Sequence, residues 1–483
     1  MTLFTTTSPF NNISNSGGRL SKNKKDCYRF VQRQRISSSR RRGNVVCSSS
    51  SSSSPSIDDD INIDTMKKIV IVGGTGRVGS SAATAIQKAF SDLNKKCSIT
   101  VASRNSSSAA AAAPLIFCKC DVNDIKSIER CIVGADLVIN TAGPFQTVKT
   151  CNVLEACINV KVPNYLDVCD DGSYAQNAKK LNNKCKQANV SAITSCGIYP
   201  GVSNIIAAKA IENQLADAKI ARERREDDDE SSNNNNNKEN VDDDFDSIEY
   251  VLYNYFTAGS GGVGTTILAT SFLLCGEDVI LYENGEKVKA EPASNRKVVD
   301  FGKGVGKREV FLYNLPEVQS THDVFNVPTV KARFGTSPGI WNAAMVAMAR
   351  ALPKDVLESK ETMQNLATFT MPIVKLVDLI VGEKMSIKID VKLKNGKVST
   401  SLFTHPKLSE CVGTSVSAFA LAMLFDSKND DAAGVYYPEE AKFVDTDRLL
   451  ERCSKGCSTF EISQAPWKLE SQPINIGFGI SFE

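Results

Sequence analysis

Glycines recur at close spacing directly after a run of β-branched residues near residue 70. The stretch 67–81 reads KKIVIVGGTGRVGSS; Gly74-Thr75-Gly76-Arg77-Val78-Gly79 fits the pattern GxGxxG, and Gly73, Gly76 and Gly79 fit GxxGxxG. Gly74 would make a tight turn, Gly76 would let backbone approach a pyrophosphate, and Gly79 would let a helix pack on the strand. The helix that begins near Arg77 would point amide N–H groups at the phosphates. We therefore predict a dinucleotide site at residues 73–79.

The end of the second predicted strand indicates which dinucleotide this is. NAD sites usually place an Asp or Glu there to bind the ribose 2′-hydroxyl, whereas this chain has Ser103-Arg104-Asn105. An arginine pairs with a 2′-phosphate through its planar guanidinium, and an acid would repel that phosphate. We therefore predict NADP(H) in preference to NAD(H).

Two further strand ends complete the predicted cofactor site. Asp121 closes the third strand, where its side chain can reach an adenine, and Ala142-Gly143-Pro144 follows the fourth. The carboxyl ends of the strands in a doubly wound sheet line its ligand crevice. We expect residues 142–144 to lie along the pyrophosphate and the nicotinamide ribose.

Three side chains are candidates for the chemistry: Tyr199 and Asp167 at strand ends, and His405, one of only two histidines. Hydride transfer needs a preorganised substrate and at most one proton donor. Tyr199 would donate that proton or stack on the nicotinamide, and a histidine that titrates near neutrality suits general acid catalysis. Each also has a structural alternative: a packed aromatic for Tyr199, a cap for Asp167 and a buried imidazole for His405.

Strands and helices alternate from Met66 onward, and this order must position those residues. Apolar runs at 98–103, 115–121, 135–143, 162–170 and 190–197 predict strands, and 78–93 and 125–132 predict helices. Such alternation implies right-handed βαβ crossovers and a parallel sheet. We predict an α/β fold whose Rossmann-type doubly wound parallel sheet occupies residues 66–205.

A second pattern occupies residues 206–460. Long alternating segments contain hairpin turns at Asn284-Gly285 and Asn395-Gly396, with helical stretches between them. They predict a second, α+β domain with a mixed or antiparallel sheet, used for substrate binding and dimerisation, and a C-terminal tail at 461–483. Residues 217–246 are so rich in acids and asparagine that we expect a disordered acidic insert.

The first 57 residues differ from the rest of the chain. They are rich in arginine, lysine, serine and threonine, and Asp26 is their only acid. Basic, hydroxyl-rich, acid-poor segments are typical of organellar transit peptides. The stretch VVCSSS at 45–50 favours a chloroplast processing site after Cys47, with a disordered basic tail as the alternative.

Cysteine spacing and hydropathy narrow the class of protein further. The fifteen cysteines include no CxxC pair and only two histidines accompany them, so we predict no metal site and buried, reduced thiols. No apolar run reaches the roughly 20 residues of a membrane span. The amphipathic stretch 366–382 favours core packing, with contact to a lipid surface or a partner subunit as the alternative.

Several motifs occur together in a fixed order: GGTGRVG at 73–79, NTAGPF at 140–145, VPNYLDVCDD at 162–171, GIYPGVSN at 197–204, RFGTSPG at 333–339, THPKLSECVG at 404–413 and GVYYPEE at 434–440. In this order the chain resembles the saccharopine dehydrogenase-like oxidoreductases, most closely the plastid-targeted plant members, over about 66–460. The resemblance implies an N-terminal NAD(P)-binding domain, a C-terminal α+β domain and a homodimer. Saccharopine-forming members typically carry Asp-Pro-Gly where this chain has Tyr199-Pro200-Gly201, which argues against saccharopine itself.

These observations together predict a plastid NAD(P)H-dependent oxidoreductase that transfers hydride to or from a small imine or carbonyl. We expect it in the chloroplast stroma or at the periphery of plastid lipid bodies, with a small-molecule substrate and no nucleic-acid partner. The alternative is a non-catalytic NADP(H)-binding sensor or scaffold protein, because an intact glycine loop beside poorly matched catalytic positions fits that class as well.

Overall fold

The computed structural model describes residues 66–105, 115–146, 148–231, 246–259, 264–427, 432–471, 474–475 and 481–482. All of them belong to one compact unit, Ile63–Glu483. The predicted transit peptide, residues 1–57, lies outside the described residues, as does the part of the predicted acidic insert at 232–245.

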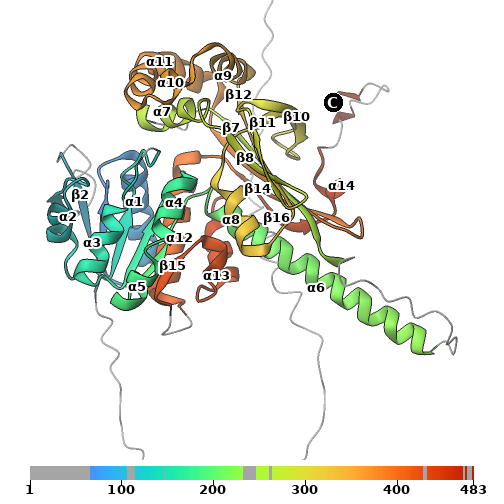
Figure 1. The fold of residues 1–483 in the computed structure, drawn as a ribbon, viewed down its shortest axis with the longest axis horizontal. Coiled ribbons are helices and arrows are strands. Elements are labelled where there is room, and N and C mark those ends of the chain that lie inside the picture. The colour runs from blue at the N-terminus through green and yellow to red at the C-terminus, as the bar shows by residue number, and fades with distance from the viewer. Residues whose placement is uncertain are drawn as a thin grey trace, which may run out of the picture. The chain divides into compact units, whose positions relative to one another are not determined.

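The first of two large sheets is parallel and has seven strands (Figure 1). Its order, β3-β2-β1-β4-β5-β6-β15, contains the doubly wound order 3-2-1-4-5-6, whose switch point lies between β1 and β4. Strands of such a sheet are covered on both faces, which explains the uninterrupted apolar run in residues 69–72. The strands are β1 (Lys67–Val72), β2 (Cys97–Ser103), β3 (Ile116–Lys119), β4 (Leu137–Asn140), β5 (Asn164–Asp167), β6 (Ser191–Ile193) and β15 (Gly434–Tyr436).

Helices cover this sheet and connect its strands. They are α1 (Arg77–Asp92), α2 (Ile125–Ile132), α3 (Asn152–Val160), α4 (Gly172–Lys179) and α5 (Asn182–Ala188). The buried face of α1 follows the helical period, with Gly79, Ala82, Ala83, Ile86 and Phe90. The predicted α/β class and the helix near 78–93 are confirmed.

A second, nine-stranded sheet has the main path β10-β11-β12-β7-β13-β14-β16, with β8 on β12 and β9 on β8. It is mixed, because β7 and β12 are parallel while their other neighbours are antiparallel. The predicted turns at Asn284-Gly285 and Asn395-Gly396 join β8 to β9 and β13 to β14. The strands are β7 (Ile248–Ala258), β8 (Val279–Glu283), β9 (Glu286–Ala290), β10 (Ser294–Asp300), β11 (Lys307–Leu312), β12 (Thr329–Ser337), β13 (Lys384–Leu393), β14 (Val398–His405) and β16 (Thr459–Gln464).

Four helices of the second half of the chain form a cluster of their own. A cluster of α7, α9, α10 and α11 packs around Phe272, Met345, Leu357 and Met363 (Figure 1). Within α11 the amphipathic stretch buries Met371 and Val374 and exposes Phe369, Ile373 and Leu376. The helices are α6 (Val202–Ser231), α7 (Thr265–Leu273), α8 (Pro316–Phe325), α9 (Gly339–Ala351), α10 (Lys354–Glu358), α11 (Lys360–Val381), α12 (Leu408–Phe425), α13 (Thr446–Cys453), α14 (Pro466–Leu469) and the 3₁₀ turn η3 (Pro438–Glu440).

The division of the chain into 66–205 and 206–460 needs correction. Strand β15 returns to the first sheet and pairs with β6, and α12 packs on α1. Ser81 Oγ donates to Ser409 O at 2.6 Å, and a Cβ at Gly413 would lie only 2.5 Å from Ser81 Oγ. The first sheet and the helices that cover it therefore include residues far along the chain. Strand β16, which belongs to the second sheet, extends into the predicted tail at 461–483.

The predicted disorder from residue 217 onward is also wrong at its start. Helix α6 continues to Ser231. Its sequence through this part is rich in Ala, Lys, Arg and Glu, which have high helix propensity, and Lys219 lies 3.9 Å from Glu223 one turn later. Charge alone therefore did not prevent a helix there.

Helix α12 is long and apolar enough to cross a membrane by length and composition. Most of its residues are buried, and it packs against α1. Core packing explains its apolar character.

One disulfide corrects the prediction of reduced thiols throughout. Cys118 on β3 is bonded to Cys131 on α2, and the two Cα atoms are 5.9 Å apart. The other eleven described cysteines form no disulfide bond, and nine of them are buried. Two cysteines thirteen residues apart were not expected to pair because neither is part of a short-range motif.

Candidate functional site

The glycine loop joins β1 to α1 at the switch point of the first sheet. A Cβ at Gly79 would lie 2.5 Å from Gly73 O, so α1 packs directly on the loop, as its predicted role requires. The turn itself depends on Gly73 rather than Gly74, because Gly73 has a φ of +79° and a Cβ there would lie 2.8 Å from the backbone N of Ala142. Gly74 instead packs against Val101.

The amino end of α1 is suited to phosphate. Gly76 is the N-cap residue and no side chain caps the helix. Gly76 is exposed, and a Cβ there would meet only Gly73 O, at 3.0 Å, so its outer side is open. Thr75 and Val78 are partly buried beside it and Arg77 is exposed. These residues fit a pyrophosphate held by backbone N–H groups and the helix dipole.

Strand β2 brings the predicted NADP(H)-selecting residues next to this loop. Thr75 Oγ1 donates to Ser103 Oγ at 2.7 Å, which ties the loop to the end of β2. Arg104 follows Ser103 and is exposed. Its guanidinium is thus accessible at the ribose end of the predicted cofactor path.

The other two predicted cofactor contacts lie at the ends of β3 and β4. Asp121 is exposed, and its Oδ1 accepts from the N–H of Asn123 at 3.0 Å, so it also fixes a turn. The Ala142 N–H donates to Asn140 Oδ1 at 3.1 Å, which fixes the 142–144 loop. From the second half of the chain, Lys360 Nζ donates to Pro144 O at 3.3 Å and to Gln146 O at 3.4 Å. Helix α11 is therefore attached to the loop that we expect along the nicotinamide ribose.

Asp167 occupies a structural position. It is 0% exposed, and its carboxylate accepts from Tyr165 Oη, Thr194 Oγ1 and the N–H groups of Cys169 and Ser195 at 2.8–3.0 Å. Burial raises its pKa, and these hydrogen bonds oppose that rise. A carboxylate with this many internal donors holds the ends of β5 and β6 together.

Tyr199 and His405 each pack against their own neighbours. The Tyr199 ring stacks on Tyr255, with centroids 4.9 Å apart, and burial raises its pKa. His405 lies at the end of β14, where its Nδ1 accepts from the N–H of Lys407 at 3.0 Å and a Cβ at Gly456 would lie 3.1 Å from its Nε2. Burial lowers the pKa of His405. Both placements agree with the structural alternatives for these residues.

The structure instead gathers carboxyl groups where the first sheet faces the second half of the chain. Asp170 follows β5, and its Oδ1 accepts from Gln146 Nε2 at 3.1 Å. Glu277 lies between α7 and β8, and its Oε2 accepts from Asn314 Nδ2 at 3.0 Å. Burial raises the pKa of Asp170 to about 6 and that of Glu277 to about 7, and the charges of Asp171 and Asp170 add to the rise at Glu277. Both groups therefore titrate near neutrality.

Two further carboxyl groups come from α8 and η3. Glu317 is 0% exposed, and its Oε1 accepts from Ser203 Oγ at 3.0 Å and Tyr255 Oη at 2.8 Å. Glu439 Oε1 accepts from Asn204 Nδ2 at 2.9 Å, and burial raises the Glu439 pKa to about 7. Burial also raises the pKa of Glu317, with a contribution from the charge of Asp170.

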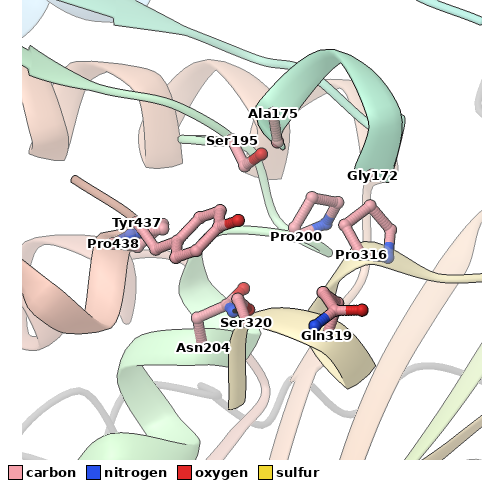
Figure 2. A pocket seen from close by; sticks show the side chains of 10 residues that line it. All are labelled: Gly172, Ala175, Ser195, Pro200, Asn204, Pro316, Gln319, Ser320, Tyr437 and Pro438. Carbon is pink, nitrogen blue, oxygen red and sulfur yellow. Dashed lines mark hydrogen bonds between the residues drawn. The ribbon is translucent and has the colours of Figure 1, made fainter. Parts of the chain in front are cut away.

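A small cavity is lined by Pro316 and Pro438, the sequence neighbours of Glu317 and Glu439 (Figure 2). Its walls come from α4, the end of β6, α6, α8 and η3, and its volume of about 10 Å³ holds roughly one water molecule. Ser195, at its wall, has a φ of +65°, an uncommon backbone conformation for a residue other than glycine. The lining residues are Gly172, Ala175, Ser195, Pro200, Asn204, Pro316, Gln319, Ser320, Tyr437 and Pro438.

The sequence analysis included Asp170 only within the motif VPNYLDVCDD, and it missed Glu277, Glu317, Lys360 and Glu439 as candidates. Of these four, only Glu439 lies within one of the recurring motifs, GVYYPEE. The others are single charged residues on helices or in loops, and nothing in their local pattern separates them from surface charges. Among the described residues no group of three or more His, Cys, Asp or Glu side chains is placed to hold a metal ion.

Comparison with known proteins gives three findings. Residues 69–193 match the family model of the saccharopine dehydrogenase NADP binding domain, which confirms the prediction of NADP(H). Carboxynorspermidine synthase from Vibrio cholerae is 36% identical over 102 residues, and this match spans 19% of the chain and 24% of that relative's length. The apo saccharopine dehydrogenase (L-Glu forming) from Saccharomyces cerevisiae superposes with a TM-score of 0.52 at 14% identity, covering 83% of this chain and 100% of that one, and confirms the fold class.

Proposed function

Because residues 69–193 match the saccharopine dehydrogenase NADP binding domain, we propose that this chain is an oxidoreductase of the saccharopine dehydrogenase-like family that transfers hydride between NADP(H) and a small imine or carbonyl substrate. The observation that carries the proposal is Lys360, which attaches α11 to the carbonyls of Pro144 and Gln146 beside the glycine loop. A second domain fixed against the nicotinamide end of the site is what a reaction needs to orient substrate and exclude water. Nucleotide binding alone requires only the first sheet.

The residues of the site divide into two groups by role. Residues 73–79 would hold the pyrophosphate, Ser103 and Arg104 the 2′-phosphate, and 142–144 the nicotinamide ribose. NADP(H) supplies or accepts the hydride when bound. Asp170 and Glu277 have pKa values of about 6 and about 7, so either exchanges a proton readily at neutral pH.

Turnover with matched variants tests the proposal. Purified protein and NADPH are incubated with a panel of small imines, aldehydes and ketones, and NADPH oxidation is followed. We expect turnover by wild type and a loss of at least about 10-fold in kcat/KM for Lys360→Met, because a charged donor to the loop is removed. Binding of 2′,5′-ADP, which lacks the nicotinamide, should not change in that variant. Tight NADPH binding without oxidation across the panel would support the sensor or scaffold alternative instead.

We also propose a plastid location, on the composition of residues 1–57. A mature N-terminus near residue 48 in plastid-fractionated protein is the expected result, and a mature N-terminus at Met1 would contradict it. The homodimer implied by the resemblance remains a prediction.

A further inference from the structure

A groove, which we name the α9 groove, runs along one face of α9 in the second half of the chain (Figure 1). Its volume is about 320 Å³, which is enough for a small organic ligand. One wall consists of α9 residues at helical spacing, from Gly339 to Arg350. The other wall consists of residues 293–296 with Glu309 and Phe311 of β11. The groove therefore shares no residue with the predicted cofactor site.

The charged side chains that line the α9 groove favour an anion. Arg296 and Arg350 are both exposed, and Glu309 is the one acid among the described lining residues. Arg296 forms an ion pair with Glu309, so these two charges compensate each other. Arg350 forms no ion pair within the described part of the chain. Two arginines against one glutamate leave one uncompensated positive charge in the groove.

Arg333 on β12 adds a buried positive charge next to the groove. Its side chain is 2% exposed, and its Nη2 donates to Oδ1 of the lining residue Asn295 at 3.2 Å. Its Nε is buried and has no hydrogen-bond partner among the described groups. Burial lowers the pKa of Arg333, and the charge of Arg333 lowers the pKa of Lys297 on β10. A buried guanidinium without a counter-charge is costly, so an anion bound at this place would stabilise the fold.

The amino end of α9 supplies hydrogen-bond donors to the same groove. Pro338 is the N-cap residue, and no side chain caps the helix. A Cβ at Gly339 would meet no atom within 4 Å, so the space beside the first residue of α9 is open. Backbone N–H groups and the dipole at such an end favour a negative charge. Arg333 and Gly339 begin and end the motif RFGTSPG, which the predicted cofactor site does not use.

We propose that the α9 groove binds a small organic anion through a carboxylate or phosphate group. Both groups accept two parallel hydrogen bonds from a guanidinium, and the amino end of a helix attracts both. The site comprises Asn295, Arg296, Gly339 and Arg350, with Arg333 behind Asn295. Anion binding here does not depend on the proposed hydride transfer, because no residue is common to the two sites.

Uncharged analogues separate anion binding from other kinds of binding. The full chain is saturated with NADPH, so that phosphate sites of the cofactor are filled. It is then titrated with succinate, succinamide, glycerol 3-phosphate and glycerol at constant ionic strength. We expect at least one of the two anions to bind and to raise the melting temperature, and the uncharged analogues to do neither. Binding of a single anion identifies carboxylate or phosphate as the recognised group. If neither anion binds more tightly than its uncharged analogue, the proposal is wrong.

Charge variants locate the anion in the protein. Arg350→Ala removes the uncompensated charge, and we expect it to weaken anion binding at least about 10-fold. Glu309→Gln removes the acid from the groove and should strengthen binding by a factor of about 2 to 5. Arg224→Ala removes an exposed arginine from α6 and should bind as wild type does. Equal losses in Arg350→Ala and Arg224→Ala, or weaker binding by Glu309→Gln, would place the anion outside the α9 groove.

The buried charge has its own test. Arg333→Met removes the guanidinium and keeps a long unbranched side chain. We expect its anion affinity to fall at least about 10-fold, and its melting temperature without anion to equal or exceed that of wild type, because an uncompensated buried charge is gone. Wild-type affinity in this variant would refute the part assigned to Arg333. If the variant does not fold, Arg350→Ala and Glu309→Gln still decide the proposal.

Discussion

At the scale of single residues, Arg104 and Gly76 are predicted to contact different parts of the cofactor. Arg104 is exposed at the end of β2, and a side chain at Gly76 would enter the space predicted for the pyrophosphate. We expect Arg104→Ala to weaken NADPH binding roughly 10- to 150-fold and to leave NADH binding unchanged, because only NADPH has the 2′-phosphate. Gly76→Val should weaken both. Fluorescence titration with both nucleotides measures this, with Lys88→Ala, an exposed charge on α1, as control. Unchanged NADPH affinity in Arg104→Ala would show that the phosphate is held elsewhere.

At the scale of elements, the disulfide attaches α2 to β3 beside the predicted adenine end of the site. The bond between Cys118 and Cys131 closes a short loop, so in the chain-entropy account it stabilises the fold by up to about 3 kcal/mol. We expect a thiol reductant to lower the denaturant midpoint of wild type and to have no effect on Cys131→Ser. Cys97→Ser, which changes a free cysteine on β2, should respond to the reductant as wild type does. Equal midpoints for oxidised and reduced wild type would contradict a stabilising bond.

At the scale of the whole molecule, the buried carboxyl groups of Asp170 and Glu439 make the free energy of unfolding depend on pH. Burial raises the pKa of Glu439 from 4.5 to about 7 and that of Asp170 from 3.8 to about 6. At a pH between the unfolded and the folded pKa of each group, the folded protein binds more protons than the unfolded chain. The free energy of unfolding therefore falls as pH rises through about 4 to 7. Glu439→Gln stays neutral and should therefore gain stability relative to wild type between pH 5 and pH 8, on the order of 2 kcal/mol. Urea unfolding of both proteins measures the difference, and Glu286→Gln, at an exposed position on β9, should show none. A stability difference that does not change with pH would mean that the pKa of Glu439 is not raised, as expected for a carboxyl group in contact with water.

The local patterns of the sequence were sufficient for the first sheet and for the hairpins. The glycine spacing at 73–79, the β-branched runs and the Asn-Gly turns act over a few residues, and the structure places strands and turns where those patterns indicate. The acidic composition after residue 217 wrongly predicted disorder as far as Ser231, because the helix propensity of these residues continues α6 to that point. It also misassigned the tight turn to Gly74, since the spacing pattern does not say which of two adjacent glycines takes a positive φ.

The sequence by itself determined the doubly wound sheet, the presence of a second sheet and the position of the glycine loop, because each depends on the order and spacing of neighbouring residues. Only the tertiary structure decided the return of β15 to the first sheet, the pairing of Cys118 with Cys131 and the gathering of Asp170, Glu277 and Glu317. These residues are far apart in the chain, and a carboxyl group acquires an unusual pKa only when packing of distant elements removes water from it. Sequence shows that such a group is present, while its chemistry depends on what the fold places around it.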